Sequence, residues 1–236
     1  MSEPLRVALV AEGPTDGVVI EAALQAIIPE DRPFILKQIF PEGSDTFGKM
    51  GTGWAGVYRW CHQSARRGAG RLEGDSVLFQ NYDLLILHLD ADVAANKYAN
   101  GSIAPNPTDA PLPCERPCPE SHDTTNALRE VLLSWCGEAN VPAKTVICMP
   151  SKSTEAWVVA ALFPNDRSVL ADIECFPNPQ SRLAQQSAKS RISKSVRDYR
   201  SKASDFVAAW PRLSGPLTEA LRFETEFLSV LDDTAK

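Results

Sequence analysis

The sequence predicts an α/β protein in which a parallel sheet is flanked by helices. Four short runs rich in apolar residues, at 5–10, 33–40, 82–89 and 144–149, are separated by segments of helical character. Strands that read as nearly continuous apolar runs are typical of a parallel sheet that is buried on both faces. The alternation of such strands with helices favours the same arrangement.

The expected helices follow from cap and breaker residues. The first strand ends in a turn at 11–17, where Thr15 or Asp16 is a suitable N-cap for a helix over 18–28 that ends before Pro29. Further helices are expected at 54–67 and 124–136, after the second and third strands. After the fourth strand, Ser153 or Thr154 is expected to cap a helix at 155–163.

The chain has 236 residues, enough for a full-sized core. We expect residues 1–165 to form the functional domain and residues 166–236 to form a helical, basic C-terminal region. The segment from about 96 to 121 is polar and rich in proline, so we interpret it as an irregular insertion in the functional domain.

Charge is distributed unevenly along the chain. The net charge of −6 gives no overall attraction to nucleic acid, but the segment 182–202 carries seven Lys or Arg residues against one acid. Phosphate contacts from this segment are one interpretation, and a solvated helix face is the other. The candidate contacts are Lys189, Arg191, Lys194, Arg197 and Arg200.

No stretch of 18 apolar residues is present, so no membrane span is expected. The first residues lack the basic start and apolar core of a signal peptide, which leads us to expect a cytoplasmic protein. In that compartment the six cysteines are expected to be free thiols or metal ligands. Cys114, Cys118 and His122 have the residue types of a structural Zn²⁺ site, with free cysteines in a loop as the alternative.

Acidic residues follow three of the expected strands. Glu12 comes after the first strand, Asp90 and Asp92 after the third, and Glu155 after the fourth. Ligands of parallel α/β sheets collect at the carboxyl ends of the strands, so these carboxylates are expected to meet there. Two or three carboxylates suit a hard divalent cation that keeps several waters, so the sequence predicts a Mg²⁺ or Mn²⁺ site. Each acid alone could also serve as a helix cap or a solvated turn residue.

These motifs resemble those of Toprim proteins. The run Glu12-Gly13-Pro14-Thr15-Asp16 after one apolar strand, and Asp90-Ala91-Asp92 after another, are similar to the two acidic Toprim motifs. Together with the segment 150–157 (PSKSTEAW), they look most like the OLD/RloB-like stand-alone nucleases. The resemblance covers about residues 5–163 and implies a Rossmann-like Toprim fold with metal-dependent phosphodiester chemistry.

The resemblance also implies roles for individual residues. Glu12 matches a glutamate that binds metal or exchanges protons, and Asp90 and Asp92 match the metal-binding Asp-x-Asp. Asp16 matches a further metal ligand of the nuclease branch, and Glu155 matches a late acidic ligand. Lys152 is in a place to stabilise charge on the scissile phosphate.

The expected function is therefore a Mg²⁺-dependent nuclease that cleaves DNA or RNA, as the effector of an antiphage defence system. The chain lacks a Gly-x₄-Gly-Lys-Ser/Thr motif, so an ATPase partner would be a separate chain. Two alternatives stay open: a phosphotransferase or hydrolase acting on a small nucleotide, and a non-catalytic Toprim regulatory subunit. A dimer is compatible with all three. His88, in the third strand, is either a core histidine or a residue that supports a metal ligand.

Overall fold

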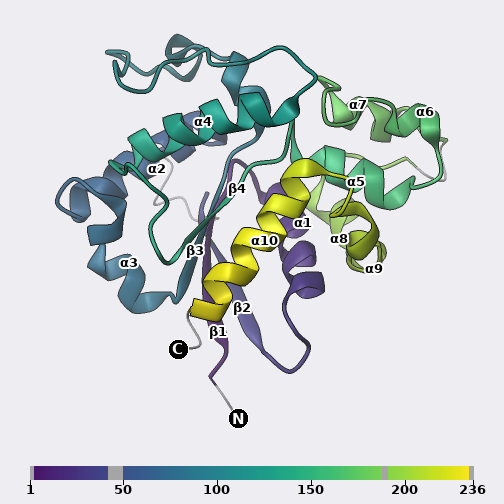
Figure 1. Cartoon of the computed structure of the whole chain (residues 1–236), viewed down its shortest axis with the longest axis horizontal. Coiled ribbons are helices and arrows are strands. Elements are labelled where there is room, and N and C mark those ends of the chain that lie inside the picture. The colour runs from purple at the N-terminus through teal and green to yellow at the C-terminus, as the bar shows by residue number, and fades with distance from the viewer. Residues whose placement is uncertain (1–2, 42–49, 188–190, 234–236) are drawn as a thin grey trace.

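The computed structural model describes residues 3–41, 50–187 and 191–233. A twisted sheet runs through the centre of the molecule, with helices on both of its faces (Figure 1). The described residues form a four-stranded sheet of order β2-β1-β3-β4, and every strand pair is parallel. The predicted α/β class, with a parallel sheet between helices, is confirmed.

The strands occupy the segments that the apolar runs indicated. Their bounds are β1 Leu5–Val10, β2 Phe34–Phe40, β3 Leu84–His88 and β4 Thr145–Cys148. β3 and β4 are buried along their whole length, as expected for strands with helices on both sides. The chain moves from β1 outward to β2 and then returns to the other side of β1 to add β3, so the β1/β3 junction is the topological switch point of the sheet.

Helices from different parts of the chain cover the two faces. One face packs against α1 (Pro14–Ile27), α5 (Thr154–Leu162), α9 (Ala203–Leu213) and α10 (Thr218–Asp233). The other face packs against α2 (Gly53–Arg67), α3 (Ser76–Asn81) and α4 (Ser121–Trp135). Shorter helices are η2 Leu72–Gly74, η3 Ala91–Ala95, η4 Tyr98–Gly101, α6 Arg167–Leu170, α7 Pro179–Ala184 and α8 Val196–Ser201.

The residues after position 165 share a core with the sheet. Trp210 from α9 and Phe223 from α10 are buried against Trp157 of α5, at ring-centroid distances of 5.4 and 5.9 Å. The C-terminal helices therefore complete the hydrophobic layer that α1 and α5 begin. No helix in the described part of the chain has the length and apolar character needed to span a membrane.

The first helix starts earlier than the sequence indicated. Gly13, rather than Thr15 or Asp16, is the N-cap of α1, and Pro14 takes the first helical position, where its fixed φ suits the helix. The side chain of Asp16 accepts a hydrogen bond from the Gly13 amide at 2.9 Å. Gly17 lies so close to Gln38 that an added Cβ would stand 2.4 Å from its Oε1. A larger residue at position 17 would therefore require the end of the Gln38 side chain to move.

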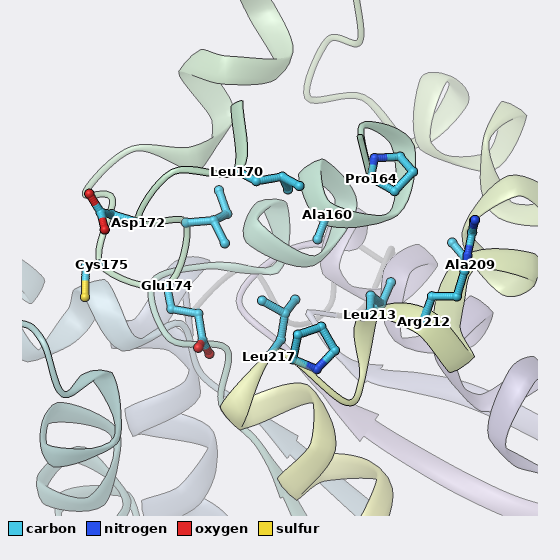
Figure 2. A pocket seen from close by; sticks show the side chains of 12 residues that line it. Ala160, Pro164, Leu170, Asp172, Glu174, Cys175, Ala209, Arg212, Leu213 and Leu217 are labelled. Atoms are coloured by element: carbon cyan, nitrogen blue, oxygen red, sulfur yellow. The ribbon is translucent and has the colours of Figure 1, made fainter. Parts of the chain in front are cut away.

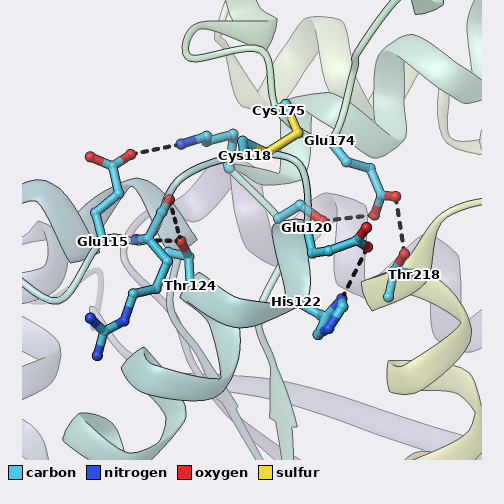
Figure 3. Close-up of a disulfide and its surroundings, with 11 residues drawn as sticks. Glu115, Cys118, Glu120, His122, Thr124, Glu174, Cys175 and Thr218 are labelled. Carbon is cyan, nitrogen blue, oxygen red and sulfur yellow. Dashed lines mark hydrogen bonds and ion pairs between the residues drawn. A yellow bond between two sulfur atoms is a disulfide. The ribbon is translucent and has the colours of Figure 1, made fainter.

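The expected zinc site is wrong, because Cys118 is bonded to another cysteine. A disulfide joins Cys118 to Cys175 across 57 residues, with the two Cα atoms 5.8 Å apart (Figure 3). Cys175 is therefore also not a free thiol. The His122 side chain is 44% exposed and lies beside Glu120 and Asp123. Burial raises the pKa of the Cys114 thiol to about 11. The expectation that all six cysteines are thiols or ligands fails for this pair.

Candidate metal centre

The candidate site lies at the carboxyl ends of β1 and β3, at the topological switch point. β1 leads into Glu12 and β3 leads into Asp90, so the parallel pairing of these strands brings both acids to one edge. The Asp90 amide donates a hydrogen bond to Glu12 Oε1 at 2.8 Å. In open α/β sheets the crevice at this position is where ligands bind.

Among the described residues, three buried side chains form a group that could hold a metal ion. Asp16, His88 and Asp90 each place one ligand atom within 4.8 Å of the others. Asp16 is 2% exposed and His88 is 0% exposed, so both are withdrawn from bulk water. His88 comes from the end of β3, Asp90 from just beyond it, and Asp16 from the first turn of α1.

His88 has an unusual hydrogen-bonding state for a buried side chain. Its Nε2 lies 3.2 Å from Asp90 Oδ1, yet neither ring nitrogen makes a hydrogen bond of good geometry within the described residues. A buried polar atom without a partner is costly, and it often marks a place where an ion or water belongs. His88 is therefore buried as a core histidine would be, but without the hydrogen bonds that such a histidine usually makes.

Thr154 joins the two acidic segments. Its hydroxyl donates to Asp16 Oδ1 at 2.8 Å, and its amide donates to Asp90 Oδ1 at 3.1 Å. Thr154 is the first residue of α5, whose N-terminal amides and dipole stabilise nearby negative charge. The hydrogen bonds fix the orientation of both carboxylates before any ligand arrives.

The clustered charges shift each other's protonation. Burial raises the pKa of Glu12 well above its usual range, and Asp90 raises it further. Burial raises the pKa of Asp90 to about 7, against the lowering effect of His88. Burial disfavours the charged form of His88, but Asp16 and Asp90 outweigh it and raise its pKa to about 9. A bound cation would relieve the repulsion between these carboxylates.

Glu155 lies beside this group but is already paired. Its Oε1 is 2.9 Å from Lys194 Nζ and also accepts a hydrogen bond from the Tyr199 hydroxyl at 2.9 Å. Burial opposes the charge of Glu155, but Lys194 and the hydrogen bond from Ser153 hold its pKa below the usual range. The basic C-terminal segment therefore reaches the acidic site through Lys194.

Asp92 and Lys152 lie at the rim of the site. Asp92 is an exposed residue of η3, and its amide donates to the Lys152 carbonyl at 3.1 Å. The ammonium of Lys152 is 2.9 Å from Glu115, in the segment between η4 and α4. The ion pair with Glu115 thus holds the Lys152 side chain against the segment between η4 and α4.

The other candidate nucleic-acid contacts do not join the acidic group. Arg191, Arg197 and Arg200 are exposed, on α8 or just before it. Lys189 lies outside the described residues. Of the described basic candidates, Lys194 is the one that contacts a predicted acidic site residue.

A separate cavity of about 360 Å³ lies away from the acidic site (Figure 2). Apolar side chains from α6, α9 and the segments that follow them form much of its wall, among them Leu170, Ile173, Leu213 and Leu217. The described residues that line it include none of the candidate metal ligands. The cavity therefore does not bear on the chemistry of the acidic group.

The structure adds three residues to the site that sequence spacing did not identify. The sequence left His88 open between a core residue and a support for a metal ligand, indicated Thr154 only as a possible helix cap, and gave no signal for Tyr199. The position of His88 two residues before Asp90, on the same face of an extended strand, was the available signal. Thr154 and Asp16 are 138 residues apart, so no local pattern links them.

No protein-family model, curated protein or solved structure matches this chain.

Proposed function

We propose that the chain is a metal-dependent phosphodiester hydrolase that cleaves DNA or RNA. The observation that carries the proposal is the buried group of Asp16, His88 and Asp90 at the switch point of a parallel sheet. Within the described part of the chain, the His88 ring makes no hydrogen bond of good geometry. The resemblance of the two acidic motifs to Toprim nucleases supplies the reaction class. A separate ATPase partner and an antiphage role follow from that resemblance alone.

The donor set fits a divalent cation that accepts both oxygen and nitrogen ligands. Carboxylates suit Mg²⁺ and Mn²⁺ alike, whereas an imidazole ligand suits transition metals better than Mg²⁺. Asp16, His88 and Asp90 would hold the ion, with Glu12 and Asp92 next to it. We therefore propose Mn²⁺ as the preferred ion, with Mg²⁺ as a weaker alternative.

The residues of the chain orient the site. When bound, the cation would polarise a phosphoryl oxygen and lower the pKa of a bound water. Thr154 holds the Asp16 and Asp90 carboxylates in place through its hydroxyl and amide. Glu12 accepts the Asp90 amide and so fixes the turn after β3. The surrounding apolar residues exclude bulk water from Asp16 and His88.

Metal titration and cleavage assays test this proposal. Purified protein is titrated calorimetrically with Mn²⁺ and with Mg²⁺, and is then incubated with plasmid, linear DNA, total RNA and mononucleotides. We expect Mn²⁺ to bind more tightly than Mg²⁺ and EDTA to abolish cleavage. Asp90→Ala should weaken Mn²⁺ binding and lower the cleavage rate by at least about 100-fold.

Lys144→Met is a suitable control, because Lys144 is exposed immediately before β4, at the opposite end of the strands. It should bind Mn²⁺ and cleave as the parent does. Cleavage that persists in EDTA, or in Asp90→Ala, would contradict the proposal. A preference for mononucleotides over polymers would instead favour the small-substrate hydrolase.

A further inference from the structure

The contact between Glu155 and the C-terminal segment is the feature of the site that the metal group does not explain. Lys194 precedes α8 and Tyr199 lies within it, and both reach the N-terminus of α5. Glu155 is 1% exposed, and the Tyr199 ring is also buried. The Glu155 and Tyr199 ends of this contact are therefore buried, and Lys194 reaches them from the surface.

Glu155 already has two protein partners on one of its carboxylate oxygens. Its Oε1 lies 2.9 Å from the Lys194 ammonium and accepts a hydrogen bond from the Tyr199 hydroxyl at 2.9 Å. Among the described residues, the group whose ligand atoms lie within 4.8 Å of one another contains Asp16, His88 and Asp90 but not Glu155. A carboxylate satisfied by protein donors is stabilised in its charged form without a cation.

Lys194 has the position and exposure that a phosphate-contacting cation needs. Its side chain is 39% exposed although its ammonium contacts a buried acid. Both Lys152 and Lys194 pair with a carboxylate at 2.9 Å, but the Lys152 side chain is only 11% exposed. Glu155 directly follows Thr154, which hydrogen-bonds to Asp16 and Asp90, so the contact with Glu155 holds the Lys194 ammonium near the metal group.

We propose that Lys194 contacts the scissile phosphate and that Glu155 is a positioning residue for Lys194 rather than a metal ligand. This inference rests on the proposed phosphodiester hydrolase. The Lys194 ammonium would donate a hydrogen bond to a non-bridging phosphate oxygen, on which negative charge increases during attack. Glu155 and Tyr199 hold α8 and Lys194 against α5. The basic segment therefore places one ammonium group, that of Lys194, beside the reacting phosphate.

The test compares Mn²⁺ affinity with cleavage kinetics in matched variants. Lys194→Met removes the charge but retains most of the side-chain length, Lys194→Arg retains the charge, and Glu155→Gln removes the anchoring charge. Lys144→Met is the control for loss of one lysine, and Asp16→Asn is the control for loss of a metal ligand. Calorimetry gives the Mn²⁺ affinity, and a labelled oligonucleotide gives kcat and KM. Thermal unfolding confirms that each variant is folded, and Tyr199→Phe replaces Glu155→Gln if the latter is not.

The inference predicts that metal affinity and catalysis respond differently. Lys194→Met should lower kcat by about 100-fold while Mn²⁺ binds as tightly as before or more tightly, because a competing positive charge is gone. Lys194→Arg should recover part of kcat. Glu155→Gln should lower kcat while its Mn²⁺ affinity stays within about 3-fold of the parent. The double variant Glu155→Gln/Lys194→Met should have a kcat no more than about 2-fold below that of Lys194→Met alone, because the two residues act as a unit.

Two results would overturn the inference without touching the proposed function. If Glu155→Gln weakens Mn²⁺ binding as much as Asp16→Asn does, Glu155 is a metal ligand. If Lys194→Met cleaves as fast as Lys144→Met does, Lys194 does not contact the phosphate. A parent protein that binds no Mn²⁺ or cleaves no polymer overturns the proposed function and, with it, the inference.

Discussion

At the scale of single residues, the candidate site depends on hydrogen bonds that orient buried carboxylates. Thr154 is the residue that most directly connects the two sources of acid, since it donates to Asp16 through its hydroxyl and to Asp90 through its amide. Replacing the Thr154 side chain by valine would leave the hydrogen bond from the backbone amide to Asp90 in place. The hydrogen bond from the hydroxyl to Asp16 would be lost. Residues that orient ligands in this way commonly affect metal affinity by 10- to 100-fold, on the order of one to three kcal/mol.

Replacement of this hydroxyl tests its role. Thr154→Val should weaken Mn²⁺ binding by about 10-fold, because Asp16 loses the donor that fixes its orientation. Calorimetric titration measures the change. Thr145→Val is the matched control: Thr145 is buried near the start of β4, and its hydroxyl has no hydrogen-bond partner in the part of the chain that is described. That control should leave Mn²⁺ affinity unchanged and stabilise the fold by about 1 kcal/mol.

At the scale of elements, a buried aspartate joins α2 to α3. Asp75 is the N-cap of α3 and accepts a hydrogen bond from the Leu78 amide. Its Oδ2 also accepts from Ser64 at 2.6 Å and from Arg67 at 2.6 Å, both on α2. Burial opposes the charge, but these donors hold the pKa of Asp75 below its usual range. The arrangement fixes the angle between two helices on the same face of the sheet.

This junction gives the fold a predictable pH dependence. The pKa of Asp75 is lower in the folded protein than in the unfolded chain. Its contribution to the free energy of unfolding is therefore fully present above the pKa of the unfolded chain, and it is lost as the pH falls through the pKa of the folded protein. Asp75→Asn should therefore destabilise the protein by about 2 kcal/mol at pH 7, and the difference from the parent should shrink below about pH 4. Urea unfolding at several pH values measures this. Glu73→Gln, at an exposed neighbouring residue, is the control and should alter stability by less than about 0.5 kcal/mol. A stability difference between Asp75→Asn and the parent that stays constant down to pH 3 would contradict the pKa argument.

At the scale of the whole molecule, distant segments hold the loop before α5 from two sides. Glu115, three residues before Cys118, pairs with Lys152, and Glu174, next to Cys175, accepts a hydrogen bond from Ser151 (Figure 3). The disulfide joins these two segments. It therefore restrains the part of the chain that presents Thr154 and Glu155 to the site.

Removal of the disulfide should lower stability through the freedom it restores to the unfolded chain. For a closed loop of this length, Cys118→Ser should cost about 4 kcal/mol in the chain-entropy estimate. Thermal unfolding of the non-reduced protein measures the loss, and thiol titration after unfolding should detect one more thiol than the four free cysteines of the parent. Cys114→Ser, in the same segment but not bonded, should have a much smaller effect. Equal melting temperatures for Cys118→Ser and the parent would show that the bond does not form.

Local sequence patterns determined the strands, the sheet class and the acids at the strand ends. Apolar runs such as 84–88 are decisive for a strand buried on both faces, and a parallel sheet then places the residues that follow, Asp90 among them, at one edge. The prediction that Asp16 and Asp90 belong to one site depended only on this geometry and on motif resemblance, and the structure brings them together. Helix ends were less well determined, because Gly13 and Thr15 are both acceptable caps.

Tertiary structure alone decided which side chains complete the site and which do not. Three features depend on the packing of distant segments. These are the lack of hydrogen bonds to the His88 ring among the described residues, the contact of Lys194 with Glu155, and the disulfide between Cys118 and Cys175. The spacing of residues along the chain carries no information about such contacts, because the loops between them can close in many ways. The sequence thus determined that the acidic residues gather at one edge of the sheet. The packing of the C-terminal helices decided that Lys194 is the basic side chain that contacts them.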